Sequence, residues 1–305
     1  RPRVHWSLFI NWYKRVLYEN CRTFFYLKIH KMNHWVMDYE TLVNCFVGVF
    51  EHYKTSERKI FIVHEKQNDF EDFIEFLKQN IDNREWHISY NGLSFDSQVT
   101  HYIIDNYDKL SKLSASEIAG SIYEYAAACI TKSNNKQFQE YPQWKMAIGQ
   151  IDLFKLHHWD NPAKRSSLKW IQYSMDWDNM LDMPIHHETL IETQDQLDLI
   201  VKYCINDVSS TKEIYKRSQS QIGLRKTLTK EYGINLFSAS EPRISKELFA
   251  YYLSKKLNIH KRDIKQMRTH RDTIKIKDIL LDYISFETPY FKALLERFKS
   301  LELNP

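Results

Sequence analysis

The sequence predicts a mixed α/β fold, in which a β-sheet is flanked by helices. Three observations support this class. Short segments rich in Val, Ile, Phe and Trp occur at 34–40, 44–50 and 59–64, as in strands. Apolar residues then recur at three- and four-residue steps over 70–81, as in an amphipathic helix. Strand-like and helical patterns continue to alternate further along the chain, and no internal repeat is visible.

The elements of this domain are expected in a definite order. The first two strands are joined by the short connection Thr41-Leu42-Val43. The helix that follows Asp69 places five apolar residues on one face: Phe70, Phe73, Ile74, Leu77 and Ile81. The remaining elements are a strand at 86–90, a helix at 95–104, a strand at 150–154 and a long helix at 194–218.

The two ends of the chain differ from this pattern. Near the C-terminus, helical spacing is visible at 248–257 and again at 291–301, and 273–284 mixes basic and β-branched residues. We therefore divide the chain into three parts: a basic aromatic N-terminal extension (1–31), the α/β domain (32–221) and a mainly helical, basic C-terminal appendage (222–305). The chain begins at Arg1, and we expect it to be a piece of a longer protein.

Charge is distributed unevenly along the 305 residues. The overall net charge is only +4, but residues 1–31 carry +6, residues 32–216 carry −10 and residues 217–305 carry +8. Carboxylates are thus concentrated in the middle, between two basic flanks. This arrangement differs from a uniformly basic nucleic-acid coat and indicates a specific use for the carboxylates.

Composition excludes several classes of protein. With 6 Gly and 7 Pro, the chain is not collagen-like or linker-rich. No apolar run approaches the length of a membrane span, so we expect no membrane partner. The four cysteines have no CxxC or CxxxC spacing. Reduced thiols and a cytoplasmic location are therefore expected, in the host cell if the source is viral.

Asp38 and Glu40 lie two residues apart on the first predicted strand, so their side chains point to the same face. Two such carboxylates repel each other in a low-dielectric core unless cations neutralise them. Hard divalent ions such as Mg²⁺ or Mn²⁺ take oxygen ligands of this kind. The plain alternative is a pair of carboxylates on an exposed strand edge.

Asp96 follows Asn91-Gly92-Leu93-Ser94-Phe95 at a strand-to-helix junction. The structural alternative is an Asp that complements the dipole at a helix N-terminus. Tyr203 and Asp207 lie four apart on the late helix and so share one face. Their alternative is a half-buried tyrosine beside a solvated aspartate. However, Cys204, Ile205 and Val208 indicate burial there, and a buried Asp needs a partner.

Together, these three signals resemble the exonuclease motifs of the DEDD family, tyrosine subclass. The motifs are Asp-x-Glu, Asn-x-x-x-Phe-Asp and Tyr-x-x-x-Asp, in this order and in these structural contexts. The sequence around these motifs is most similar to the 3′→5′ proofreading domains of phage-type DNA polymerases. The resemblance covers about residues 35–215 and implies a ribonuclease H-like fold. No polymerase palm motif is visible before Pro305.

The resemblance also implies roles for individual residues. Asp38, Glu40, Asp96 and Asp207 would hold two divalent metal ions, Mg²⁺ or Mn²⁺, and Tyr203 would orient the attacking water. Thr41 and Leu42 match positions that hold the terminal nucleotide through backbone and apolar contacts. Asn91 and Phe95 match positions along the path of the single strand, where a ring can stack on a base.

Other signals carry less information. The histidine pairs His157-His158 and His186-His187, and His30 with His34, do not complete a zinc site, so we predict surface or satisfied histidines. Asp152 is expected to be structural. Lys164, Arg165 and Lys169 form a basic cluster, of which Lys169 is the candidate phosphate contact. Basic flanking residues are candidate nucleic-acid contacts, the densest set being Lys255, Lys256, Lys261, Arg262, Lys265, Arg268 and Arg271.

The sequence thus predicts a two-metal 3′→5′ DNA exonuclease. Its partners would be single-stranded DNA or the frayed 3′ end of a primer–template, and possibly a DNA polymerase domain or subunit. Two alternatives remain open: an exonuclease that processes RNA, and a catalytically silent nucleic-acid-binding subunit.

Overall fold

The computed structural model of the chain describes residues 33–157, 166–267 and 271–304. The predicted N-terminal extension therefore lies outside the described residues, as do Lys164, Arg165 and Arg268. Contacts divide the chain into two compact units, one ending at Ser245 and the other beginning at Lys246. The first unit thus continues beyond residue 221, where we had placed the boundary.

The first unit is built on a six-stranded mixed sheet with the order β4-β3-β2-β1-β5-β6. Its strands are β1 (His34–Leu42), β2 (Cys45–His52), β3 (Arg58–His64), β4 (Gln67–Asn68), β5 (Trp86–Ser89) and β6 (Gly149–Asp152). Strands β1 to β4 are antiparallel neighbours, whereas β5 runs parallel to β1 and β6 runs parallel to β5. The predicted mixed α/β class is confirmed.

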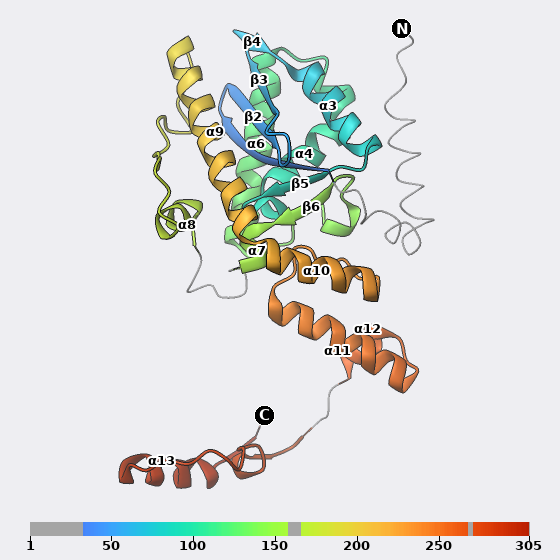
Figure 1. The fold of residues 1–305 in the computed structure, drawn as a ribbon, viewed down its shortest axis with the longest axis vertical. Coiled ribbons are helices and arrows are strands. Elements are labelled where there is room, and N and C mark those ends of the chain that lie inside the picture. The colour runs from blue at the N-terminus through green and yellow to red at the C-terminus, as the bar shows by residue number, and fades with distance from the viewer. Residues whose placement is uncertain (1–32, 158–165, 268–270, 305) are drawn as a thin grey trace. The chain divides into compact units, whose positions relative to one another are not determined.

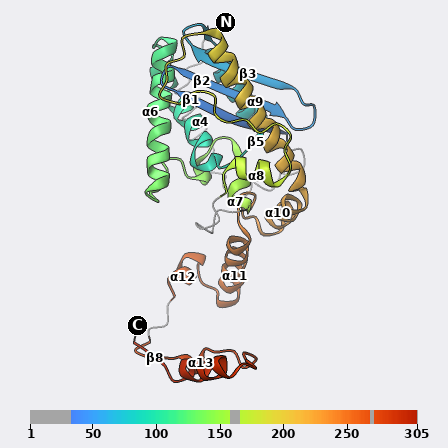
Figure 2. The same cartoon turned by 90° about the vertical axis from the view of Figure 1, so that its left-hand side faces the viewer.

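Helices cover both faces of this sheet (Figure 1). One face packs against α3 (Phe70–Asp82), α4 (Asp96–Asp105) and α6 (Ala115–Asn134). The other face packs against the long helix α9 (Gln194–Arg217) (Figure 2). Alternating side chains of β1 serve both cores: Trp35, Met37 and Tyr39 face the first, and Val36 and Leu42 face α9.

Further helices complete the first unit. These are α5 (Tyr107–Leu110), α7 (Leu153–His157), α8 (Leu168–Ser174), α10 (Gln219–Tyr232) and the start of α11 (Glu241–Leu257), with short 3-10 turns η2 (Gly92–Ser94) and η3 (Gln143–Lys145). The buried guanidinium of Arg225 in α10 donates from Nε to the Ala239 carbonyl at 2.8 Å and so fixes the chain beyond residue 221. Among the described residues, no helix is both long and apolar enough to cross a membrane.

The second unit contains the rest of α11, α12 (Lys261–Gln266), β7 (Ile274–Lys275), η5 (Ile276–Asp278), α13 (Pro289–Lys299) and β8 (Glu302–Leu303). Its regular structure is mostly helical, as predicted, and β7 pairs with β8 as an antiparallel ribbon.

Two local predictions were wrong. Thr41 and Leu42 belong to β1, because the backbone pairing with β2 continues to Leu42 opposite Cys45. Only Val43 and Asn44 therefore connect the two strands. The strand predicted at 150–154 ends at Asp152, and α7 begins at Leu153.

Candidate active site

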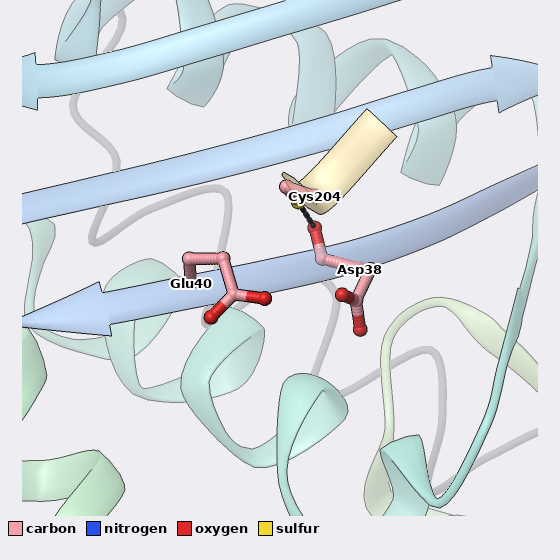
Figure 3. A group of neighbouring side chains, drawn as sticks. All are labelled: Asp38, Glu40 and Cys204. Carbon is pink, nitrogen blue, oxygen red and sulfur yellow. Dashed lines mark hydrogen bonds between the residues drawn. The ribbon is translucent and has the colours of Figure 1, made fainter. Parts of the chain in front are cut away.

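Asp38 and Glu40 lie on the face of the sheet that α9 covers. They alternate with buried neighbours along β1, opposite Val49 and Val47 of β2, which belong to the core on that face. Figure 3 shows both side chains on β1, with Cys204 of α9 beside Asp38. The strand period of two residues therefore places the two carboxylates side by side, as the sequence predicts.

Helix α9 brings Asp207 and Tyr203 to the same place. Its apolar residues Leu197, Ile200 and Val208 are fully buried against the sheet. Because Tyr203 and Asp207 lie one turn apart, they share a face, and only 8% and 6% of their surfaces are exposed.

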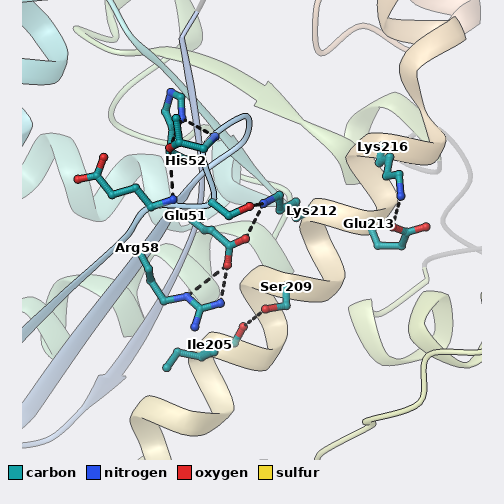
Figure 4. A network of polar contacts seen from close by, with 11 residues as sticks. Glu51, His52, Arg58, Ile205, Ser209, Lys212, Glu213 and Lys216 are labelled. Atoms are coloured by element: carbon teal, nitrogen blue, oxygen red, sulfur yellow. Dashed lines mark hydrogen bonds and ion pairs between the residues drawn. The ribbon is translucent and has the colours of Figure 1, made fainter.

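A charged network holds α9 against the sheet close to this site (Figure 4). Glu51 of β2 accepts a hydrogen bond from Lys212 of α9 at 2.6 Å. The other oxygen of Glu51 accepts from Arg58 of β3, also at 2.6 Å. Because the Glu51 side chain is nearly buried, these charge-assisted bonds fix the position of α9 along the strands.

The partner of buried Asp207 is a neutral amide. Gln172 of α8 donates from Nε2 to Asp207 Oδ1 at 3.0 Å and to Ser210 Oγ at 2.8 Å. Gln172 is itself fully buried. The sequence correctly indicated that Asp207 needs a partner, but the partner comes from another helix, which helical spacing along α9 does not reveal.

Asp96 is held where β5 leads into α4. Its Oδ1 accepts the backbone N–H of Tyr39 at 3.2 Å, which ties Asp96 to the strand residue between Asp38 and Glu40. The turn before it requires Asn91 at a φ of 66°. It also requires a glycine at Gly92, because a Cβ there would clash with the Ser89 side chain.

Asp152, at the end of β6, organises this turn. The carboxylate is fully buried. Oδ1 accepts the N–H groups of Asn91 at 3.0 Å and Lys155 at 3.2 Å, and Oδ2 accepts that of Leu93 at 3.0 Å. The geometry agrees with the predicted structural role and shows what that role is.

Four predicted carboxylates line one pocket of about 600 Å³: Asp38, Glu40, Asp96 and Asp207. They come from β1, α4 and α9. Asn91 and Phe95 line the same pocket, as do apolar groups of Tyr90, Phe154 and Leu168. The site thus combines an acidic centre with aromatic and aliphatic walls.

Burial, together with the crowding of carboxylates, raises the pKa values of the acidic residues in this pocket. Burial raises the pKa of Asp38 well above its usual value, and the charges of Asp96, Glu40 and Asp207 add to this effect. Burial and the charge of Asp207 raise the pKa of Glu40 in the same way. Burial raises the pKa of Asp96 to about 7. The pocket therefore favours protonated carboxylates unless cations bind, because none of the described residues that line it is itself a cation.

The composition of the donor set fits hard divalent ions. Asp38, Glu40, Asp96 and Asp207 offer oxygen atoms only, the ligands that Mg²⁺ and Mn²⁺ take. Ligand atoms of Asp38, Glu40 and Cys204 lie within 4.8 Å of one another. However, the Cys204 thiol donates to the Asp38 carbonyl oxygen at 3.4 Å, and burial raises its pKa well above the usual value. A protonated thiol is a poor metal ligand. The candidate metal ligands are therefore the carboxylate oxygens and not the sulfur of Cys204.

Tyr203 interacts with the carboxylates without lining the pocket. Burial, with the charges of Asp207 and Glu40, raises the pKa of its hydroxyl. The hydroxyl is therefore protonated at neutral pH and acts as a hydrogen-bond donor.

Lys169 of α8 is a cation close to this group of predicted residues. Its Nζ lies 5.9 Å from the centroid of the Tyr203 ring and forms an ion pair with Asp182 at 2.6 Å. Its charge lowers the pKa values of Glu40 and Asp207, against the larger raising effect of burial.

Leu42 does not occupy the predicted position. Its side chain is fully buried in the core beneath α9, because it shares the inward face of β1 with Val36. In this structure the Leu42 side chain therefore offers no exposed apolar surface for the predicted nucleotide contact. Thr41 is partly exposed and does not line the pocket.

Sequence reasoning missed the wall that α6 contributes. Ile130, Ser133 and Asn134, at the end of this helix, line the pocket. The signal was present in the chain: Ser114 and Glu117 form a capping box at the start of α6.

The described histidines of the considered pairs do not assemble a metal site. His157 is hydrogen-bonded to Ser218 at 2.8 Å, and His186 lies 3.9 Å from the carboxylate of Glu188. His30 and His158 lie outside the described residues.

Comparison of the chain with models of known protein families found no matching family, and comparison with curated proteins found no relative. The functional interpretation therefore depends on the geometry of the site and on the sequence motifs.

Proposed function

We propose that this chain is a metal-dependent 3′→5′ exonuclease of the DEDD type, tyrosine subclass. The observation that carries the proposal is the convergence of Asp38, Glu40, Asp96 and Asp207 on one pocket. These residues come from three separate elements, and burial raises the pKa of each, with repulsion from the other carboxylates adding to the effect at Asp38 and Glu40. An arrangement of this kind destabilises the fold unless cations bind, so a functional use is the economical explanation.

The architecture is compatible with a ribonuclease H-like fold. Antiparallel β3, β2 and β1 continue into parallel β5 and β6, with helices on both faces. Asp38 and Glu40 lie on β1 and Asp96 follows the carboxyl end of its parallel neighbour β5, where ligands bind in open α/β sheets, and α9 adds Asp207.

The chemistry follows from the donor set. Divalent ions bound by the four carboxylates supply charge stabilisation for phosphodiester hydrolysis and a water that is readily deprotonated. Asp38, Glu40, Asp96 and Asp207 would hold these ions through their carboxylate oxygens. Tyr203, which stays protonated, would orient the attacking water through its hydroxyl. Asn91 and Phe95 would line the path of the single strand, where a base can stack on the ring.

The proposed substrate is the 3′ end of single-stranded DNA, or the frayed end of a primer–template. Proofreading for a DNA polymerase domain or subunit is the proposed context, since the motifs resemble those modules. A cytoplasmic location agrees with the free thiols of Cys45, Cys129 and Cys204.

The direct test removes the carboxylate pair. Asp38→Ala with Glu40→Ala should abolish release of mononucleotides in Mg²⁺ or Mn²⁺ and should abolish thermal stabilisation by Mn²⁺. The matched control is Asp72→Ala with Glu75→Ala, two exposed carboxylates on α3. Full metal-dependent activity in the first variant would refute the proposal.

A second comparison distinguishes the alternatives. Faster hydrolysis of RNA than of DNA with the same sequence would identify an RNA-processing exonuclease. Tight binding without turnover in saturating Mn²⁺ would identify a silent binding subunit.

A further inference from the structure

The connection between α6 and β6 carries two unusually exposed aromatic side chains. Phe138 is 99% exposed and Trp144 is 68% exposed. Lys136 and Lys145 lie in the same connection and Lys132 lies in the last turn of α6, and Lys145 Nζ is 5.0 Å from the centroid of the Trp144 ring. We define the aromatic–lysine surface as Lys132, Lys136, Phe138, Trp144 and Lys145.

This surface begins at the wall of the pocket. Ser133 and Asn134 line the pocket, and they are neighbours of Lys132 and Lys136 in the chain. The backbone N–H of Gln137 donates to the Lys132 carbonyl at 2.8 Å and turns the chain at the end of α6.

The middle of the connection is fastened to the turn that carries Phe95. Gln98 of α4 clamps the backbone of Tyr141: its Oε1 accepts the N–H at 2.9 Å, and its Nε2 donates to the carbonyl at 2.8 Å. The same amide donates to the Leu93 carbonyl at 2.9 Å. Gln98 is fully buried. Phe138 therefore lies on a stretch of chain that is attached to the pocket on both sides.

A second exposed aromatic pair borders the pocket and offers a contrast. Trp170 and Tyr173 of α8 are 60% and 64% exposed, with ring centroids 5.9 Å apart. The chain that follows them is acidic, with Asp176, Asp178 and Asp182, and the adjacent Lys169 is already paired with Asp182. The aromatic–lysine surface instead has three lysines and one carboxylate, Glu140. Charge thus favours the aromatic–lysine surface for an anionic ligand.

We propose that the aromatic–lysine surface binds single-stranded nucleic acid immediately behind the terminal nucleotide in the pocket. This inference rests on the proposed exonuclease function and extends it to the path of the strand. Only the terminal nucleotide would occupy the pocket, so affinity for the rest of the strand must come from surfaces outside it. Exposed rings stack on bases of any sequence, and lysines contact the phosphates.

The test measures binding in EDTA, where no hydrolysis occurs. Fluorescein-labelled thymidine oligonucleotides, a trinucleotide and a dodecanucleotide, are titrated with the whole chain. We expect Phe138→Ala with Trp144→Ala to weaken binding of the dodecanucleotide about 30-fold, since each ring contributes stacking energy. Binding of the trinucleotide should change by less than about twofold, because the pocket is intact. The matched control, Trp170→Ala with Tyr173→Ala, should bind both as the wild type does.

Salt dependence tests the lysines separately. For single strands, the logarithm of affinity falls with the logarithm of salt by about 0.7 per neutralised phosphate. Lys132→Gln, Lys136→Gln and Lys145→Gln together should therefore reduce this slope by about 2.

The outcomes separate the two proposals. If the Phe138/Trp144 variant and the wild type bind the dodecanucleotide with equal affinity, the proposed binding role of the aromatic–lysine surface is refuted, even if the wild type hydrolyses DNA. Weaker binding of that variant, in a wild type that hydrolyses nothing in Mn²⁺, would support the surface and contradict the exonuclease function.

Discussion

Replacement of the buried Asp152 by Asn tests how the turn before Asp96 is positioned. Asp152 and Asn have the same shape, so no cavity forms. With the amide oxygen at the Oδ1 position, the bonds from Asn91 and Lys155 survive. The amide NH₂ then faces the N–H of Leu93, which the carboxylate accepts at 3.0 Å in the wild type. Two donors now oppose each other, and the turn has to move.

The expected cost in stability is modest. An unsatisfied buried N–H costs about 1–3 kcal/mol. Loss of the buried charge offsets part of this, because burial raises the pKa of Asp152 and so disfavours the ionised form. We therefore expect the free energy of unfolding to fall by about 1–2 kcal/mol.

The expected cost in activity is larger. The turn carries Asn91 and Phe95 and ends at Asp96, all of which line the pocket. A displacement of about 1 Å in such groups can reduce the rate about 100-fold. Urea denaturation measures the first effect, and release of mononucleotides in saturating Mn²⁺ measures kcat.

A matched control separates the two effects. Ile74→Val in α3 removes one buried methyl group far along the chain from the turn and costs about 1 kcal/mol. It should leave kcat within about twofold. If Asp152→Asn retained wild-type kcat, or if Ile74→Val lost as much activity, the positioning role of Asp152 would be refuted.

Three further predictions concern titration, catalysis and the position of α9. In EDTA, the pKa of Asp96 is about 7 in the folded state and 3.8 in the unfolded state. Its contribution to stability is therefore full below about pH 4 and is lost as the pH rises through 7. Tm should fall over this pH range in the wild type, and should fall less in Asp96→Asn. Tyr203→Phe should lower kcat about tenfold or more with little change in KM and with Mn²⁺-dependent stabilisation retained; an unchanged kcat would exclude the water-orienting role. Glu51→Gln weakens the hydrogen bonds to Lys212 and Arg58 and should lower the free energy of unfolding, measured with urea, by about 2 kcal/mol. A decrease of less than about 0.5 kcal/mol would contradict this role of Glu51.

Local patterns predicted those parts of the fold that depend on neighbours in sequence. The alternation in β1 placed Asp38 and Glu40 together, and the helical period placed Tyr203 beside Asp207. The same alternation would have placed Leu42 inward, had the end of β1 been recognised. Helix α6 was not predicted, because its many small and polar residues leave no distinct apolar face in the sequence, although Ser114 marks its N-terminus.

The sequence by itself therefore determined which acidic side chains line the pocket and on what kind of element each one lies. Only the tertiary structure decided that Gln172 partners Asp207, that Asp152 fixes the turn before Asp96, and that the end of α6 closes the pocket. The physical reason is the range of each effect. The periods of strands and helices are properties of the local backbone, whereas contacts between distant segments depend on how helices pack on the two faces of the sheet.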